Sequence, residues 1–275
     1  MDLALRPRSA TELVDAAVRL FRQHFGAFIT LALVAAVPRL AIAGAQLALF
    51  GGVAMAANPF AMFSGTYFLL LFASLLVAGV FEGAFVSLAD EALRTGTATP
   101  GSALSRGMAR AVPVLVTFVI VAVVVTFGLA LFVAPGIYLG LRLYPAVATA
   151  ALEGVGPGEA LARAWRRTSG AVGRAFVMYL VIFVLVVLVG FAGSLVGGVL
   201  GGIAGGVTGG GGSGRAAVGA LVVAALVQVL VGVLYYPLLS AAATLFYYDT
   251  RVRSEGLDVE LMADALGGRP GAAAY

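Results

Sequence analysis

The sequence predicts an all-α integral membrane protein whose six transmembrane helices form three repeats of an interfacial amphipathic helix plus a helical hairpin. Two observations predict this class. The chain of 275 residues is 61% hydrophobic and 11% charged, with a mean hydropathy of +1.06, so it has too little polar surface to cover a water-soluble globule. Long apolar runs also alternate with short segments that carry arginine. These runs are apolar on every side, whereas a membrane β-barrel would need short strands of alternating polarity.

The apolar runs set the expected spans, because about 20 residues of helix cross the roughly 30 Å hydrocarbon core. The fourth run is short and holds Arg142 and Pro145. The first run follows an arginine-bearing helix, so we expect the N-terminus to stay in the mature chain. The membrane domain is expected over 1–252, with the last helix continuing to about 248, and a cytoplasmic tail over 253–275. The expected spans are 25–50, 67–88, 112–133, 137–152, 175–195 and 216–236.

The arginines predict the orientation. The chain has no lysine, and fourteen of its 17 basic residues fall before the first span, after the sixth, or in the second–third and fourth–fifth connections. The opposite side has only Arg215. Under the positive-inside rule both termini lie in the cytoplasm. The lack of lysine, with heavy use of Ala, Gly, Val and Arg, indicates a GC-rich bacterial genome, so we expect the bacterial inner membrane. Nucleic-acid binding is disfavoured despite a net charge of +4, because the arginines are dispersed among the spans.

The segments before the odd-numbered spans each predict an amphipathic helix, because apolar positions recur at i, i+3, i+4 and i+7. Ser9 with Glu12 fits a capping box, and Pro100 and Pro157 suit a first helical position. Six residues after each leading leucine stands Arg19, Arg110 or Arg167. The predicted faces are Leu13, Ala16, Ala17 and Leu20; Leu104, Gly107, Met108 and Ala111; and Leu161, Ala164, Trp165 and Thr168.

Two interpretations fit these helices. They are connectors on the inner membrane surface, anchored by Trp165 and the arginines, or they form a cytoplasmic ring that binds anionic headgroups or a protein partner. An arginine near an anionic leaflet gains about 1 kcal/mol in either case.

An acidic residue stands where each even-numbered span is expected to leave the membrane: Glu91, Glu153 and Asp249. A negative charge at a helix C-terminus opposes the helix dipole, so each needs compensation. The repeated arginines Arg19, Arg110 and Arg167 are candidates, and solvation among the headgroups is the alternative.

Residues 197–214 are dominated by glycine and predict a mobile outer loop, because such a run has little helix propensity. A phosphate-binding loop would need a following Lys and Ser/Thr, which Arg215 and Ala216 do not supply.

Three charged residues fall within spans and are candidates for an intramembrane polar site: Arg39, Glu82 and Arg142. Charges at membrane depth are costly when unpaired and often functional. They form a pocket for a headgroup or anionic solute, joined by Gln228, or a structural ion pair with arginines reaching to water. Arg142 is expected near mid-membrane.

Catalysis finds no support. His24 is the single histidine and cysteine is absent, so neither a clustered histidine metal site nor a thiolate is available. Glu82 is the one carboxylate expected within the spans. We expect no enzyme activity, no metal and no cofactor.

The phrase FYYDTRVRSEGLDVE at 246–260 resembles the end of the membrane domain associated with bacterial glycerophosphoryl diester phosphodiesterases. LRPRSATELVDAAVRLFRQHFG at 5–26, APGIYLGLRL at 134–143 and EGVGPGEALARAWRRTSG at 153–170 agree in order. The resemblance implies a stand-alone membrane domain, because the hydrolytic activity of the fused relatives belongs to a separate soluble barrel. It implies a fold and not a mechanism.

Two functions are therefore expected as alternatives. The first is a non-catalytic inner-membrane module that organises membrane lipids or a protein partner at its cytoplasmic face, in envelope or glycerophospholipid metabolism. The second is a small transporter whose pathway is lined by Arg39, Glu82 and Arg142. The contact residues expected for the first function are Arg19, Arg110, Arg163, Trp165, Arg167, Asp249, Arg251 and Arg253.

Overall fold

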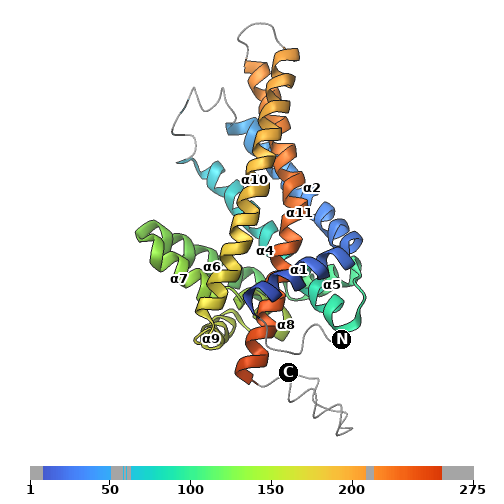
Figure 1. Ribbon diagram of the computed structural model, residues 1–275. Coiled ribbons are helices and arrows are strands. Elements are labelled where there is room, and N and C mark those ends of the chain that lie inside the picture. Colours follow the sequence, from blue (N-terminus) through green and yellow to red (C-terminus); the bar gives the residue numbers. More distant parts are fainter. Residues whose placement is uncertain (1–8, 51–57, 59, 61–62, 209–213, 256–275) are drawn as a thin grey trace. The chain divides into compact units, whose positions relative to one another are not determined.

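The computed structural model describes residues 9–50, 58, 60, 63–208 and 214–255 (Figure 1), and their regular structure is helical throughout. In chain order the helices are α1 (Ala10–Gln23), α2 (Phe25–Phe50), α4 (Gly65–Thr95), α5 (Pro100–Ala109), α6 (Ala111–Leu131), α7 (Val133–Leu143), α8 (Ala146–Glu153), α9 (Pro157–Arg167), α10 (Val172–Thr208) and α11 (Gly214–Glu255).

Five of these helices are long and apolar enough to cross a membrane. They correspond to the expected first, second, third, fifth and sixth spans, the third of which ends two residues earlier than expected, so the chain is an all-α, multi-pass membrane protein. The spanning stretches are Phe25–Phe50, Gly65–Thr95, Ala111–Leu131, Val172–Ile203 and Val222–Ser254.

The expected fourth span over 137–152 is not one continuous helix. The chain forms the short helices α7 and α8 instead, with a break at Tyr144 and Pro145. Proline has no N–H to donate, and its ring clashes with the carbonyl four residues earlier, so α7 ends at Leu143. A sixth unbroken span is therefore not found among the described residues.

The glycine-rich stretch is helical as far as the structure describes it, because α10 continues to Thr208. The loop expected over 197–214 is thus wrong for 197–208, and residues 209–213 lie outside the described residues. Close helix packing explains two glycines of α10. A Cβ added at Gly193 would lie 2.5 Å from Val231 Cγ2, and one at Gly197 would lie 3.3 Å from Ala224 Cα. Small residues let membrane helices approach in this way.

The chain forms two compact units. Unit 1 takes in the described residues of Met1–Phe28, Gly79–Ile182 and Leu238–Tyr275, and unit 2 those of Ile29–Ala78 and Phe183–Pro237. The long helices α2, α4, α10 and α11 each contribute to both. The expected tail over 253–275 starts inside α11 and lies outside the described residues from 256 onward.

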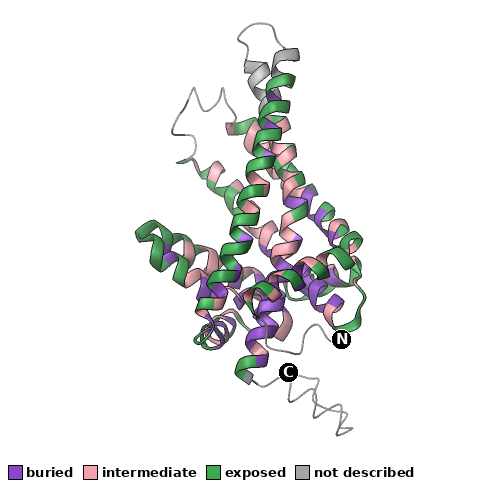
Figure 2. Ribbon diagram, viewed as in Figure 1, coloured by how far each residue is buried: buried purple, intermediate pink, exposed green. Residues whose placement is uncertain are grey.

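Unit 1 contains the densest core, where Phe85, Phe246 and Tyr247 are at most 1% exposed. Helix α5 packs closely on α4, since a Cβ at Gly107 would lie 2.7 Å from the Ala84 backbone. Figure 2 shows that burial is uneven along the chain and that much of α6, α7 and α10 is exposed. Those exposed side chains are largely apolar, as expected of surfaces that face lipid.

The amphipathic helix α1 has the predicted face, because Leu13, Ala16, Ala17 and Leu20 are all buried. The capping box is confirmed as well: the Glu12 N–H donates to Ser9 Oγ, and the Ser9 N–H donates to Glu12 Oε2.

The other two amphipathic helices begin as predicted, with Pro100 and Pro157 in their first turns, but their buried faces match the predicted ones only in Gly107, Ala164 and Thr168. Helix α5 buries Ala103 and Gly107 while Met108 is exposed. The buried positions of α9 are Ala160, Ala164 and Arg167, followed by Thr168, whereas Trp165 is 40% exposed.

Replacing Ser9 with alanine should lower the free energy of unfolding by about 0.5–2 kcal/mol, because it removes the capping oxygen of α1. Thermal unfolding in detergent measures the loss. Ser9→Asp keeps an acceptor and should behave as the parent protein does, and equal losses in both variants would contradict the capping role.

Candidate anion-binding cleft

The end of α8 is held by an arginine from the start of α6. Arg110 Nη1 donates to the carbonyls of Ala151 and Leu152 at 2.6 and 2.7 Å, which lack partners within the last turn of a helix. Gly154 then ends the helix with a φ of +67°, a conformation that glycine adopts without strain. Glu153, the last residue of α8, is thereby fixed in place.

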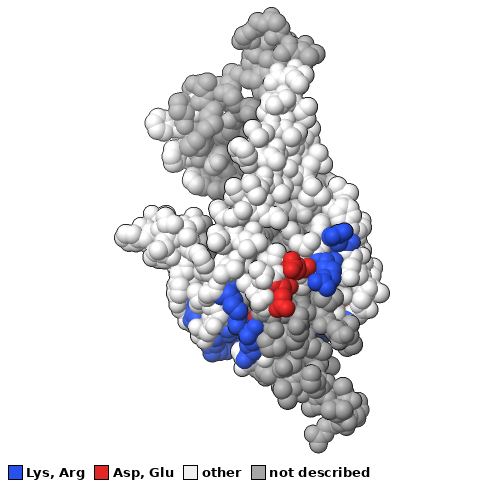
Figure 3. Space-filling view, in the orientation of Figure 1, with Lys and Arg blue, Asp and Glu red and all other residues white. Residues whose placement is uncertain are grey.

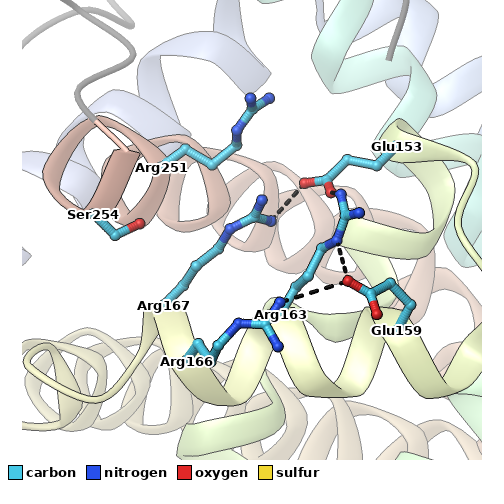
Figure 4. A pocket seen from close by; sticks show the side chains of 7 residues that line it. All are labelled: Glu153, Glu159, Arg163, Arg166, Arg167, Arg251 and Ser254. Atoms are coloured by element: carbon cyan, nitrogen blue, oxygen red, sulfur yellow. Dashed lines mark hydrogen bonds and ion pairs between the residues drawn. The ribbon is translucent and has the colours of Figure 1, made fainter.

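Beside Glu153 lies a cleft of about 560 Å³ formed by α8, α9 and the end of α11 (Figure 4). Helix α9 supplies most of the lining, because its charged residues recur on one side of the helix. The seven lining residues are Glu153, Glu159, Arg163, Arg166, Arg167, Arg251 and Ser254.

Glu153 is the buried centre of the hydrogen-bond network in this cleft. Its carboxylate accepts from Arg163 Nη1 at 2.5 Å, Arg167 Nη1 at 2.5 Å and the Tyr247 hydroxyl at 2.7 Å. The side chains of Glu153 and Arg167 are only 5% and 6% exposed. Burial raises the pKa of Glu153, but hydrogen bonds from Arg167, Tyr247 and Arg163 outweigh it and hold the pKa below its ordinary value.

Glu159 orders the outer side of α9. Its Oε1 lies 2.8 Å from Arg163 Nε, four residues along the helix, and 3.5 Å from Arg166 Nη2. The Arg166 side chain is 66% exposed and its ion pair is the longer one. Arg166 is thus the most accessible cation of α9.

Helix α11 supplies the opposite wall. Tyr247 presents its ring to two cleft arginines, with the guanidinium carbons of Arg167 and Arg251 lying 5.6 and 5.8 Å from the ring centre. Ser254 donates to the Thr250 carbonyl at 2.7 Å. Four arginines and two glutamates line the cleft, so its formal charge is +2. Such a surface suits an anion with several acceptor oxygens, because guanidinium groups bind phosphate and carboxylate in two-pronged fashion.

A second tyrosine makes the matching contact at the end of α4. The Tyr248 hydroxyl donates to Asp90, and Arg94 Nε contacts both groups, at 3.0 Å from the hydroxyl and 2.8 Å from the carboxylate. Adjacent residues of α11 therefore hold acidic residues at the ends of two different helices.

The three acidic residues near the ends of α4, α8 and α11 all have arginine partners, but among the described residues only Arg167 of the three candidate arginines is one of those partners. Glu153 pairs with Arg167. Glu91 pairs with Arg106 of α5, while Arg110 donates to carbonyls. The Asp249 side chain, 2% exposed, lies 3.2 Å from Arg253 and 3.8 Å from Arg174. Arg19 is exposed on α1.

The expected intramembrane residues are divided between the two units. In unit 2, Arg39 lies over the Tyr236 ring at 4.2 Å. In unit 1, Glu82 accepts from Ser240 at 2.9 Å, and Arg142 lies over the Trp165 ring at 4.1 Å. The mid-membrane position expected for Arg142 assumed an unbroken span, and α7 ends one residue after it. Gln228 donates to Ser194 within unit 2. That these residues line a transport pathway stays a prediction.

Sequence reasoning named Arg163, Arg167 and Arg251 but missed Glu159, Arg166 and Ser254. Spacing could have identified Glu159 and Arg166, because Glu159, Arg163 and Arg166 stand at i, i+4 and i+7 and therefore share one side of a helix. Among the residues the structure describes, no group of His, Cys, Asp and Glu is placed to hold a metal ion.

The pKa of Glu153 predicts a dependence of stability on pH. This pKa is lower in the folded chain than the ordinary 4.5, so the carboxylate contributes its full stability above 4.5 and loses it as the pH falls through the folded value. Lowering the pH from about 6 to about 3 should therefore reduce the melting temperature in detergent, with a smaller reduction in Glu153→Gln. Parallel curves for the two proteins would contradict a role for Glu153.

Fold and cleft together define a multi-pass α-helical membrane protein with an arginine-lined cleft. No family model matches the chain, and no curated protein or solved structure matches it either.

Proposed function

We propose that the protein is a non-catalytic module of a bacterial inner membrane that holds an anionic group, from a lipid or a protein partner, in the arginine-lined cleft. The observation that carries this proposal is the cleft's lining of four arginines and two glutamates, with a formal charge of +2, beside helices with apolar exposed surfaces. On the face drawn in Figure 3, charged side chains gather in one band and most of the surface is uncharged. From Ala175 to Thr208, α10 has no charged residue.

In the proposed topology both termini are cytoplasmic and α7 with α8 forms a broken sixth crossing. Support comes from unit 1, where α7 packs along α6 (Figure 1). Arg110 at the start of α6 bonds to carbonyls at the end of α8. The chain thus returns to the side from which α6 began, which keeps the arginine-bearing segments on one side, as the positive-inside rule requires.

A threefold repeat is part of the proposal. Ser87, Thr149 and Thr244 are buried near the ends of α4, α8 and α11, and each donates to the carbonyl four residues earlier. An amphipathic helix also precedes each of α2, α6 and α10. With the resemblance of the closing phrase, these features support a stand-alone member of the membrane-domain family associated with glycerophosphoryl diester phosphodiesterases.

The test is native mass spectrometry of the protein released gently from its own membrane. We expect an anionic lipid or an acidic protein to be retained, and at least about a tenfold loss of it in the double variant Arg166→Gln, Arg251→Gln. These two arginines are chosen because neither is paired with the buried Glu153 in the ion pairs described above.

The matched control is Arg22→Gln, which removes an exposed arginine of α1 outside the cleft. Equal retention by the parent, the double variant and the control would rule out the cleft as the binding site. Retention of zwitterionic lipid alone would also rule out anion binding by the cleft.

A further inference from the structure

Arg142 is a buried cation that has no acidic partner in the part of the chain that the structure describes. The residue is 6% exposed, and its Nε is buried with no hydrogen-bond partner. No carboxylate of the described residues lies within ion-pair distance of its guanidinium, in contrast to Arg163 and Arg167, which share Glu153. Burying an unpaired charge costs several kcal/mol, so an anion at Arg142 would be strongly favoured.

Two aromatic rings flank this guanidinium. Its carbon lies 4.1 Å from the centre of the Trp165 ring and 5.9 Å from that of Tyr138. The rings meet edge to face at 6.1 Å and are 40% and 45% exposed. Each cation–π contact contributes about 0.5–2 kcal/mol, which is smaller than the cost of the unpaired charge. The rings orient the guanidinium but do not neutralise its charge, so a counter-anion is still needed.

The three residues are held together by their helices. Tyr138 and Arg142 stand four residues apart on α7 and therefore share a face. Thr168, which follows α9, donates from its hydroxyl to the Arg142 carbonyl at 3.0 Å. This bond ties the end of α9, and with it Trp165, to the end of α7. The site is thus formed before any ligand arrives.

We propose that Arg142, Trp165 and Tyr138 form a second anion site, separate from the cleft, which takes the phosphate of a membrane glycerophospholipid. A planar guanidinium binds two phosphate oxygens at once. Exposed Trp and Tyr side chains favour the membrane–water interface, where such phosphates lie. The rings would contact the glycerol and the first methylene groups while Arg142 binds the charge.

Trp165 makes the site directly observable, because it is the single tryptophan of the chain. The purified protein in a neutral detergent is titrated with short-chain phosphatidylglycerol, with phosphatidylcholine of the same chain length, and with inorganic phosphate. We expect a saturable change in tryptophan emission with phosphatidylglycerol, a weaker one with phosphatidylcholine, and none with inorganic phosphate at equal concentration. In Arg142→Gln the affinity for phosphatidylglycerol should fall at least about tenfold.

Arg22→Gln is the matched control, since it removes an exposed arginine of α1 that belongs neither to the cleft nor to this site, and it should leave the titration unchanged. If Arg142→Gln does not fold, Arg142→Lys keeps the charge but loses the planar fork, and affinity should again fall. Identical curves for the parent and the folded Arg142 variant would overturn the proposal. A saturable response to inorganic phosphate alone would overturn the lipid as the source.

Discussion

Replacing Glu153 with glutamine is expected to lower the free energy of unfolding by about 3–5 kcal/mol, as removal of one member of a buried ion pair generally does. The carboxylate accepts from Arg163, Arg167 and Tyr247. Glutamine would remove the negative charge that pairs with the Arg167 guanidinium, which is 6% exposed. Arg167 would then have to reach water or distort the junction of α8, α9 and α11.

Thermal unfolding in detergent measures this effect, and a chain of this size should lose roughly 6–20 °C of melting temperature. Glu159→Gln is the matched control, because that side chain is 48% exposed and exposed ion pairs contribute at most about 1 kcal/mol. Similar small losses in both variants would show that the Glu153 network adds little to stability.

Replacing Gly136 with alanine is expected to destabilise the α6–α7 hairpin by about 1–3 kcal/mol or more. A Cβ at this position would lie 2.4 Å from the backbone nitrogen of Leu129 and 2.7 Å from its Cα. Both are backbone atoms, so no side-chain rotation relieves the clash and the two helices must move apart. Gly128 faces Gly136 across the same contact, where a Cβ would lie 2.8 Å from the Gly136 Cα.

Gly140 on the same helix provides the control. A Cβ there would make ordinary contacts at 3.7 Å with Val125 side-chain atoms. Since glycine inside a helix costs about 0.5–1 kcal/mol relative to alanine, Gly140→Ala should be neutral or stabilising. The two variants are compared by thermal unfolding in detergent, and a stabilised Gly136→Ala would rule out the close contact between α6 and α7.

Local patterns predicted helices better than they predicted which face each helix buries. In α1 the apolar residues alone determine the face, and the periodicity identified it. In α9 the ion pair to Glu153 draws Arg167 inward and leaves Trp165 exposed, which hydrophobic spacing cannot reveal.

Two further predictions, the unbroken fourth span and the glycine-rich loop, were wrong because proline and glycine each occur in two kinds of structure. Pro145 lies within the expected fourth span, which it interrupts by separating α7 from α8. The glycines between 197 and 208 were read as part of a loop, yet they belong to α10, and Gly197 lies close to α11. Glycine favours a loop in water and close helix packing in a membrane, and the choice depends on a neighbouring helix far along the chain.

The candidate cleft was predictable only in part, because its lining also depends on helices that are far apart along the chain. Arg163 and Arg167 were predicted, and the charged spacing within α9, which is local, would have added Glu159 and Arg166. The juxtaposition of α9 with Glu153, Arg251 and Ser254 depends on how three helices meet, which neither spacing nor composition determines.

The hydrogen bonds of the adjacent residues Tyr247 and Tyr248 fix the rotation of α11 about its own axis within unit 1. Successive helical residues differ by about 100° in direction and 1.5 Å in height, so Tyr247 can reach Glu153 on α8 while Tyr248 reaches Asp90 on α4. A turn or slide of α11 by one residue would withdraw both hydroxyls from both carboxylates together. Any motion of this part of α11 should therefore be all-or-none, releasing the ends of α4 and α8 in a single step.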